Sequence, residues 1–324
     1  MIKIDLRKTV SVLILVVSPA IVLYSLFSEP LHSTSGIVTP IEIEKRAFWL
    51  KLDKDSRNEE IIETIKRLRI SYVYLYIPLF KEVSLEKHRR FIGQVQKECP
   101  HTEIYPWITR VVRSPLTFES KRLLYTLRKF IKDFNPPGIH LDFEPTFGSR
   151  DFRYLPQYIY FLQALKGELI TNGKKLSIAI FPEMVKRFFQ KNPSRKKDLA
   201  VLADAVDQFV LMMYDTGIHD KDRFLHHMVS HIIFFNGLTG SKNKEKKEIM
   251  IGAASYGEHA NKKYRWMHNP GIENIETTVG LLQQYLKKNS KSKRKIRIDG
   301  YAIFRYGTTD PSEWAQFLKE TGNR

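Results

Sequence analysis

The stretch GIHLDFE, residues 138–144, alternates apolar and polar residues. Its apolar positions are Ile139, Leu141 and Phe143, and its polar positions are His140, Asp142 and Glu144. Successive side chains of a β-strand point to opposite faces, so we expect the apolar set to pack against helices and the polar set to face a barrel interior. Buried ionisable groups are costly without partners, and this cost indicates a functional site.

Seven other short apolar runs share this β-rich character, and amphipathic stretches with helical spacing lie between the runs. The predicted strands are residues 47–52, 72–77, 103–108, 138–143, 176–181, 208–213, 249–253 and 300–304. Strands that alternate with helices indicate a parallel sheet, and eight units in one domain favour a closed (β/α)₈ TIM barrel. We therefore predict a TIM barrel over residues 43–324. The chain has no glycine-rich phosphate loop, which argues against a nucleotide-binding sheet and a nucleotide cofactor.

Composition narrows the class of protein further. The 324 residues include 53 Lys and Arg against 35 Asp and Glu, a net charge of +18. The lysine-rich runs 241–248 and 287–297 hold no aromatic residue that could stack on a base. We interpret them as solvated loops and expect no nucleic-acid partner; attraction to anionic lipids or envelope polymers is the alternative. A single cysteine, Cys99, excludes an internal disulfide and the cysteine-based zinc frameworks.

The N-terminal segment predicts a membrane anchor. Residues 9–28 carry no charge and are long enough to span a bilayer, while Lys3, Arg7 and Lys8 precede them. The positive-inside rule places residues 1–8 in the cytoplasm and the remainder outside, with residues 29–42 as a linker. The alternative is a cleaved signal peptide and a secreted protein, although the apolar run is long for a signal peptide.

The chemistry that Asp142 and Glu144 favour is proton transfer. Two strand residues separate their backbones by roughly 6.5–7 Å, and a charge on Asp142 raises the pKa of Glu144 at that range. Glu144 would then stay protonated as a general acid for glycoside cleavage. A second carboxylate on the same strand is poorly placed to attack the opposite sugar face, so we expect the acetamido oxygen of the substrate to attack instead.

Residues 137–144 resemble the strand-four signature DGxDxDxE of family 18 glycoside hydrolases, the chitinase-like barrels. Asp142 and Glu144 match the last Asp and the catalytic Glu of that signature, whereas Pro137 and His140 stand at the two earlier Asp positions. We expect His140 to hydrogen-bond Asp142 in their place. Residues 212–215 (MMYD) are similar to the MxYD motif of the family at strand six, which implies that Tyr214 and Asp215 bind the N-acetyl group. The stretches 251–257 and 300–304 resemble strands seven and eight, with Phe304 where the family has Trp.

The candidate site residues fall into two groups. The predicted catalytic residues are Glu144, Asp142, Tyr214 and Asp215. The predicted substrate-binding residues are His140, Trp107, Tyr76, Glu183, Met212, Tyr256, Phe304 and Arg305. Each aromatic in this set could equally be packing at the barrel rim, and Asp215 could cap the next helix. No metal site and no cofactor are predicted, because among the histidines only His140 lies at a strand position where a ligand set could form.

We thus expect a membrane-anchored enzyme outside the cytoplasm that cleaves a polysaccharide containing N-acetylglucosamine by a retaining, substrate-assisted mechanism. The alternative is a catalytically silent barrel that binds saccharide of the cell envelope. The sequence does not decide the oligomeric state.

Overall fold

The computed structural model describes residues 45–79, 85–119, 121–145, 152–239, 246–257, 262–290 and 296–322. The predicted cytoplasmic start (1–8), anchor (9–28) and linker (29–42) lie outside these residues. Within the described ranges, no helix has the length and apolar character that crossing a membrane requires.

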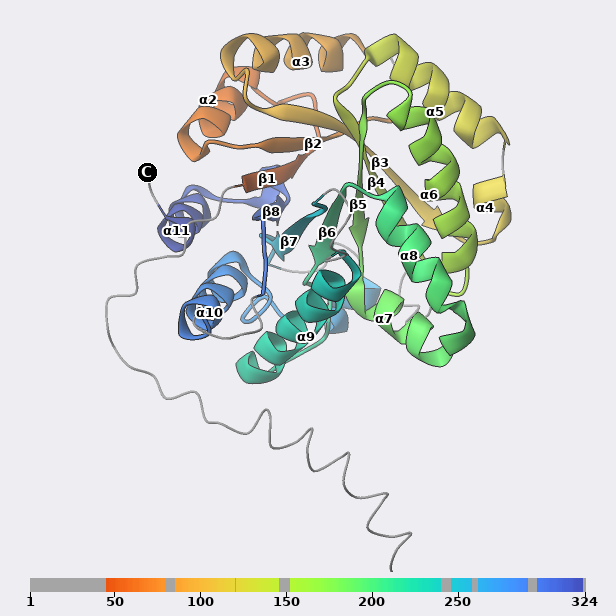
Figure 1. The fold of residues 1–324 in the computed structure, drawn as a ribbon. Coiled ribbons are helices and arrows are strands. Elements are labelled where there is room, and N and C mark those ends of the chain that lie inside the picture. The colour runs from red at the N-terminus through yellow and green to blue at the C-terminus, as the bar shows by residue number, and fades with distance from the viewer. Residues whose placement is uncertain are drawn as a thin grey trace, which may run out of the picture. The chain divides into compact units, whose positions relative to one another are not determined.

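Eight parallel strands form a closed barrel in chain order, with β8 paired to β1 (Figure 1). The strands are β1 (Lys45–Leu50), β2 (Tyr72–Tyr76), β3 (Glu103–Val112), β4 (Gly138–Pro145), β5 (Lys175–Ile180), β6 (Gln208–Met212), β7 (Glu248–Ala254) and β8 (Gly300–Phe304). The predicted TIM barrel is confirmed. Strands β3 and β4 run further than expected, because they pair with each other from Trp107 and His140 up to Val112 and Pro145.

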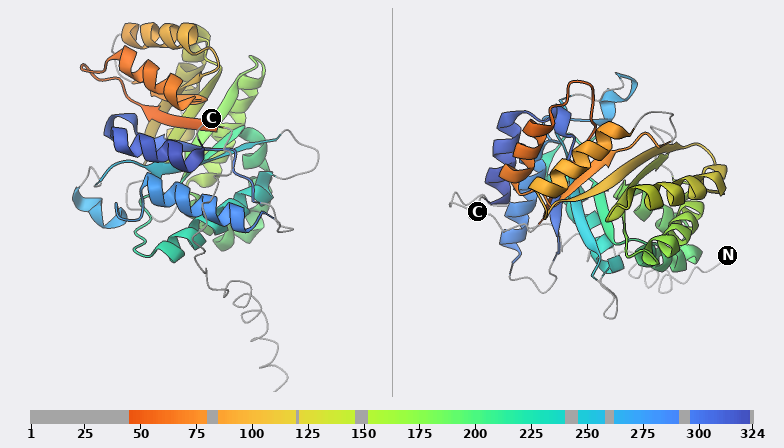
Figure 2. Two further views of the ribbon diagram at one scale, coloured as in Figure 1. Left: turned by 90° about the vertical axis from the view of Figure 1, so that its left-hand side faces the viewer. Right: turned by 90° about the horizontal axis from the view of Figure 1, so that it is seen from above.

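Helices surround the barrel on its outer side in all views (Figures 1 and 2). They are α2 (Asn58–Leu68), α3 (Glu86–Glu98), α4 (Leu116–Glu119), α5 (Lys121–Phe134), α6 (Leu155–Ile170), α7 (Pro182–Lys191), α8 (Lys196–Ala205), α9 (Lys221–Thr239), α10 (Ile275–Lys288) and α11 (Pro311–Thr321). Short 3-10 turns span Pro193–Arg195, Lys262–Met267 and Tyr306–Thr308. Local sequence accounts for several boundaries. For example, Asp310 and Glu313 form a capping box at the start of α11, and Pro311 occupies its first turn.

Two apolar clusters stabilise the barrel. The outer cluster lies between strands and helices and includes Ile139, Leu141 and Phe143 of β4. The inner cluster fills the barrel with aromatic side chains, among them Trp49 and Tyr74. Burying each large side chain stabilises the fold by roughly 1.5–3 kcal/mol. Ile139, Leu141 and Phe143 thus face the helices, as the alternation of apolar and polar residues in β4 predicts.

Close backbone contacts and one buried arginine fix the closure of the barrel. A Cβ at Gly300 would lie 2.2 Å from the Lys45 carbonyl oxygen, so only glycine fits where β8 meets β1. The guanidinium of Arg46 donates to the Leu68 carbonyl oxygen at 2.9 Å and to that of Thr321 at 3.5 Å. Arg46 thus joins the ends of α2 and α11, the first and last described helices.

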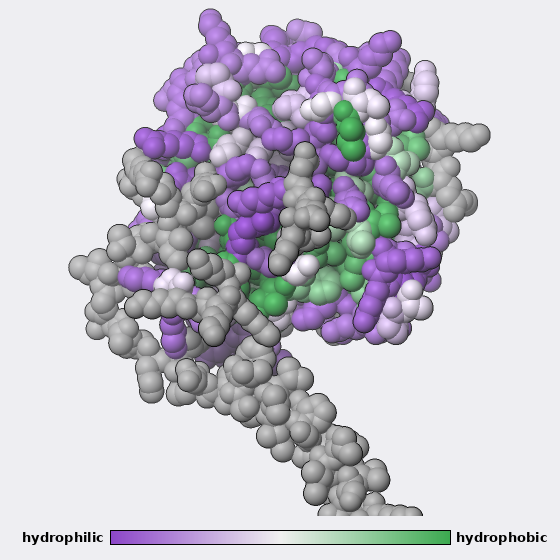
Figure 3. Space-filling model, in the orientation of Figure 1, coloured by the Kyte–Doolittle hydropathy of each residue, from purple (hydrophilic) through white to green (hydrophobic). Residues whose placement is uncertain are grey.

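Hydrophilic residues cover most of the described surface on the face shown in Figure 3, with hydrophobic residues visible between them. The helices therefore turn their polar sides outward. In a TIM barrel, function lies at the carboxyl ends of the strands.

Candidate active site

Strand β4 carries the predicted acid pair into the barrel. Phe143 points outward, where its ring stacks against Phe118, Tyr158 and Phe161 at centroid distances of 6.2, 5.9 and 5.9 Å. Asp142 on the opposite face is 4% exposed, and its Oδ2 accepts a hydrogen bond from Trp107 Nε1 at 2.9 Å. Trp107 therefore orients the carboxylate and leaves its other oxygen to interact elsewhere.

Asp142 and Glu144 titrate as a pair. Burial raises the pKa of Asp142 to about 6, against the lowering effect of hydrogen bonds from Trp107 and Glu144. Burial also raises the pKa of Glu144 well above its usual value, and the charge of Asp142 and the hydrogen bond between the two carboxyl groups add to the rise. The pair therefore releases its last proton at a higher pH than an isolated glutamate does, and that proton resides on Glu144.

His140 does not contact Asp142 in the way the sequence led us to expect. Its Nε2 accepts from Trp49 Nε1 at 3.0 Å, its Nδ1 lies 2.8 Å from Ser177 Oγ, and its ring stacks on Tyr74 at 3.9 Å. The side chain is fully buried, and burial lowers its pKa well below the usual value. The expected hydrogen bond from His140 to Asp142 is therefore not formed, because both ring nitrogens are occupied in the barrel core. The predicted role of His140 in binding substrate stays a prediction.

His140 belongs to a chain of hydrogen bonds through the barrel interior that sequence reasoning missed. Because Nε2 accepts from Trp49, Nδ1 carries the proton and donates to Ser177. Ser177 Oγ donates to Gln208 Oε1 at 2.6 Å, and Gln208 Nε2 donates to Glu248 Oε2 at 2.8 Å. Lys45 pairs with Glu248 at the far end. Every donor in this chain points from the Trp49 end toward Glu248.

The end of β6 brings Tyr214 and Asp215 to the same region. Tyr214 stacks on Phe304 at 5.6 Å with 20° between the rings, and Tyr256 meets it edge-on at 6.2 Å. Burial raises the pKa of Tyr214, and the charges of Asp142, Glu144 and Asp215 raise it further. Tyr214 therefore lies close enough to the β4 pair to interact with it electrostatically. Met212, the last residue of β6, lies two residues before Tyr214 and is buried.

Asp215 occupies a defined and unusual backbone position. Its φ of 56° is in the left-handed region, which Asp tolerates better than most residues. Tyr256 donates its hydroxyl to Asp215 Oδ1 at 2.7 Å. The residue therefore turns the chain at the end of β6 and presents a fixed carboxylate.

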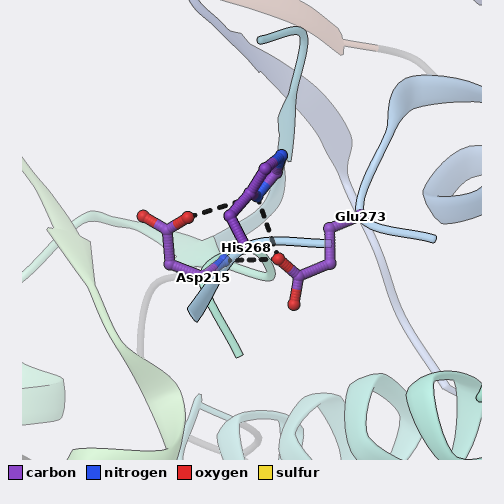
Figure 4. Close-up of side chains that lie close together, drawn as sticks. All are labelled: Asp215, His268 and Glu273. Carbon is purple, nitrogen blue, oxygen red and sulfur yellow. Dashed lines mark hydrogen bonds and ion pairs between the residues drawn. The ribbon is translucent and has the colours of Figure 1, made fainter. Parts of the chain in front are cut away.

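Two residues that the sequence did not single out complete the surroundings of Asp215. His268 Nδ1 lies 3.2 Å from Asp215 Oδ1 and 3.0 Å from Glu273 Oε2, so the imidazole sits between two carboxylates (Figure 4). Both are in the segment between β7 and α10, and nothing in its local pattern marks them. Their partner, Asp215, is more than 50 residues away in the chain, so only the fold brings the three together.

The trio has the composition of a metal site, and its three ligand atoms lie within 4.8 Å of one another. However, Glu273 Oε2 already accepts from the backbone N–H of Asp215 at 2.9 Å and of Asn269 at 3.2 Å. Its Oε1 accepts from the N–H of Thr216 at 2.8 Å and from the Thr216 hydroxyl. Because these donors occupy the Glu273 oxygens, the arrangement suits a protonated imidazole better than a metal ion.

Phe304 forms an aromatic floor with the other rings of the site. Its ring lies 5.5 Å from Trp49, 6.0 Å from Trp107 and 6.0 Å from Tyr256. Tyr76, half-buried at the end of β2, meets Trp107 edge-on at 5.5 Å. The structure thus gathers the predicted aromatics around the acid pair, where both packing and contact with a sugar face are available.

Glu183 and Arg305 are not joined to this cluster by any hydrogen bond or ion pair within the described part of the chain. Glu183 lies in the first turn of α7 and faces Arg187 of the same helix at 3.7 Å. Arg305 follows β8, and its carbonyl oxygen accepts from Ser255 and Thr308. Glu183 therefore interacts with Arg187 on its own helix, and Arg305 interacts with Ser255 and Thr308 through its backbone carbonyl.

Comparison with known proteins supports the fold. No model of a protein family matches the chain, and no curated sequence does. Among solved structures, the chain is similar to a class V chitinase from Pseudomonas fluorescens Pf-5 (15% identity, TM-score 0.52, 86% of this chain and 100% of that one). It is also similar to a family 18 chitinase from Pseudoalteromonas aurantia, with 12% identity and a TM-score of 0.58 over 86% of this chain and 100% of that one. The spore cortex-lytic enzyme SleL of Bacillus megaterium QM B1551 is similar with 14% identity and a TM-score of 0.51 over 91% of this chain and 79% of that one. The fold is thus that of the family 18 chitinase-like barrels.

Proposed function

We propose that the chain is a glycoside hydrolase that cleaves glycans containing N-acetylglucosamine with retention of configuration, with Glu144 as the general acid. The observation that carries this proposal is the acid pair on β4, in which burial and the charge of Asp142 raise the pKa of the half-buried Glu144 well above its usual value. A carboxylic acid with a raised pKa is what protonation of a glycosidic oxygen requires.

In the first step, the Glu144 proton passes to the glycosidic oxygen as the bond from that oxygen to C1 breaks. The acetamido oxygen of the same sugar attacks C1 and forms a cyclic, positively charged intermediate, which the negative charge on Asp142 stabilises. Tyr214 and Asp215 would orient the acetamido group. In the second step, water attacks C1 as the bond from C1 to the acetamido oxygen breaks, which regenerates the acetamido group. The attacking water gives a proton to Glu144, so configuration is retained and the enzyme is restored.

We further propose that residues 9–28 anchor the protein in a membrane with the barrel outside the cytoplasm. The uncharged stretch and its basic N-terminal flank support this orientation. An envelope glycan would then be the accessible substrate. Because the similar structures include chitinases and cortex-lytic enzymes, both chitin oligomers and peptidoglycan should be assayed.

The second candidate function is a silent barrel that binds saccharide. One observation favours it: His140, which stands where the family has an Asp, is locked between Trp49 and Ser177 and cannot relay a proton to Asp142. Retention of both Asp142 and Glu144 favours the hydrolase.

The deciding experiment compares the full-length wild type with Glu144→Gln on chitin oligomers, peptidoglycan and poly-N-acetylglucosamine. The substitution keeps the shape of the side chain but removes its titrating proton, so turnover should fall by about 100-fold or more. Glu98→Gln is the matched control, because this exposed residue pairs with Lys66 at the opposite end of the barrel. Equal turnover in wild type and Glu144→Gln contradicts the assignment, and no turnover by the wild type with preserved binding supports the silent barrel.

A further inference from the structure

His268 is enclosed by acceptors on both sides of its ring. Nδ1 faces Asp215 and Glu273 at 3.2 and 3.0 Å, and Nε2 lies 3.0 Å from the carbonyl oxygen of Tyr256. Its side chain and that of Glu273 have no solvent exposure. A carbonyl oxygen only accepts hydrogen bonds, and so does a carboxylate, so an imidazole with a proton on each ring nitrogen suits these neighbours best.

The charge of the imidazole follows from the same contacts. Burial by itself opposes a positive charge on His268, but hydrogen bonds to Asp215 and Glu273 and the charges of these two groups outweigh burial and raise the pKa to about 9. Below that pH His268 is an imidazolium inserted between two carboxylates.

We propose that His268, held in place by Glu273, is a positioning residue that fixes the Asp215 carboxylate as an oriented anion for the acetamido group of the substrate. This inference rests on the proposed function, because Asp215 acquires its role there. His268 acts through Asp215 and not on the reacting atoms. Glu273 completes the arrangement, because it holds both His268 and the backbone N–H of Asp215.

The charged groups around the imidazole explain why such a cation is needed. Asp215 follows β6 in the chain, Tyr256 follows β7, and Glu273 lies just before α10. Beyond Asp215 lies the β4 pair, since the charge of Asp215 contributes to the raised pKa of Glu144. His219, exposed, reaches the region through Asn269 at 2.9 Å. His268 thus places a positive charge between the carboxylates of Asp215 and Glu273.

The first test measures the imidazole directly. Carbon-13 labelling of the histidines in the full-length chain, with the His268 signal assigned by its loss in His268→Gln, gives the protonation state by NMR. We expect His268 to be charged at pH 7 and to titrate near pH 9. Glu273→Gln should lower that pKa. A His268 that is neutral at pH 7 overturns the proposal.

The second test measures positioning. In His268→Gln we expect kcat on an N-acetylglucosamine oligomer to fall by roughly 100-fold, a loss typical of misplacing a group at the reaction centre, with a smaller change in KM. His268→Lys keeps a cation and should recover part of kcat, and its alkaline limb should move up toward the lysine pKa of about 10.4. His101→Gln, at an exposed turn before β3, is the control with unchanged activity.

The third readout does not depend on turnover. The carboxyl carbon signal of Asp215, assigned by its loss in Asp215→Asn, should shift in His268→Gln and be unaffected in His101→Gln. A wild type that hydrolyses no N-acetylated glycan contradicts the proposed function, whereas the Asp215 signal still decides this inference. An unchanged Asp215 signal, or unchanged kcat, in a folded His268→Gln variant overturns it.

Discussion

Trp49 Nε1 donates a hydrogen bond to His140 Nε2 at 3.0 Å, and this one bond determines which nitrogen of the imidazole carries its proton. The proton is on Nδ1, which points to Ser177 and away from Asp142. His140, which stands where the family 18 signature has Asp, therefore belongs to the core of the barrel and not to the proton chemistry of the site.

Replacing His140 tests whether this residue serves the barrel core and not the proton chemistry of the site. His140→Ala leaves the Trp49 N–H and the Ser177 hydroxyl short of a partner and opens a cavity, so the free energy of unfolding should fall by about 3 kcal/mol. Urea unfolding measures the loss. The folded fraction should keep the pH dependence of activity. A variant as stable as the wild type would show that His140 is not part of the core network.

Asp142→Asn should stabilise the protein while it removes activity. Folding raises the pKa of Asp142 from 3.8 to about 6, so the folded state binds this proton more tightly than the unfolded chain. Between these pH values stability from this group falls as the pH rises, and at pH 7 the buried charge is a net cost. The neutral amide should raise the free energy of unfolding at pH 7 by roughly 1–3 kcal/mol. Its gain should shrink toward pH 4, and a constant or absent gain would contradict the buried charge.

Phe304→Ala should weaken saccharide binding. The substitution removes the ring that contacts Tyr214 and three other aromatics, so a sugar would lose its apolar support. Affinity for an N-acetylglucosamine oligomer, measured by calorimetry, should fall by about tenfold or more. Tyr125→Ala, an exposed aromatic on α5, is the matched control. Equal affinity in wild type and Phe304→Ala would place the sugar elsewhere.

Chelation should leave the protein unchanged. Because backbone donors and His268 fill the oxygens of Glu273, EDTA treatment should alter neither turnover nor the melting temperature. Added Zn²⁺ should raise the melting temperature only if it displaces the His268 proton. Loss of activity on EDTA treatment that Zn²⁺ restores would instead make the trio a metal site.

The membrane topology can be tested independently of the glycan. A reporter fused after Ser33 or at Arg324 should lie outside the cytoplasm, and the protein should stay with membranes through a high-salt wash. We expect this orientation because basic residues precede the uncharged stretch 9–28 and should stay in the cytoplasm. Release into the soluble extracytoplasmic fraction would show that the segment is cleaved.

The sequence was sufficient for the barrel because each strand is a local pattern. The alternation in 138–144 indicates which side chains face inward, and the structure places Ile139, Leu141 and Phe143 against the helices as predicted. It does not indicate which inward residue meets which, since that depends on the register between strands. Lys45 and Glu248 are 203 residues apart, and their ion pair could not be predicted from periodicity.

The contacts within the candidate site were predictable only where they are local in the sequence. Asp142 and Glu144 are two residues apart, so local spacing alone indicates that they interact. His268 and Glu273 meet Asp215 only through the loops that follow β6 and β7, and a polar residue in a loop is ordinary. The error on His140 has the same origin, because its partners Trp49 and Ser177 come from two other strands.

The direction of the hydrogen bonds from Trp49 to Glu248 constrains how this barrel can change during evolution. Each interior side chain accepts a hydrogen bond from one neighbour and donates one to the next. A substitution that turns one donor into an acceptor therefore places two acceptors opposite each other, and the reverse change places two donors opposite each other. An Asp at position 140 would meet a hydroxyl already committed to Gln208. Substitutions along the chain must therefore occur in compatible sets, and an acid at that position would require coordinated changes at Ser177 and beyond.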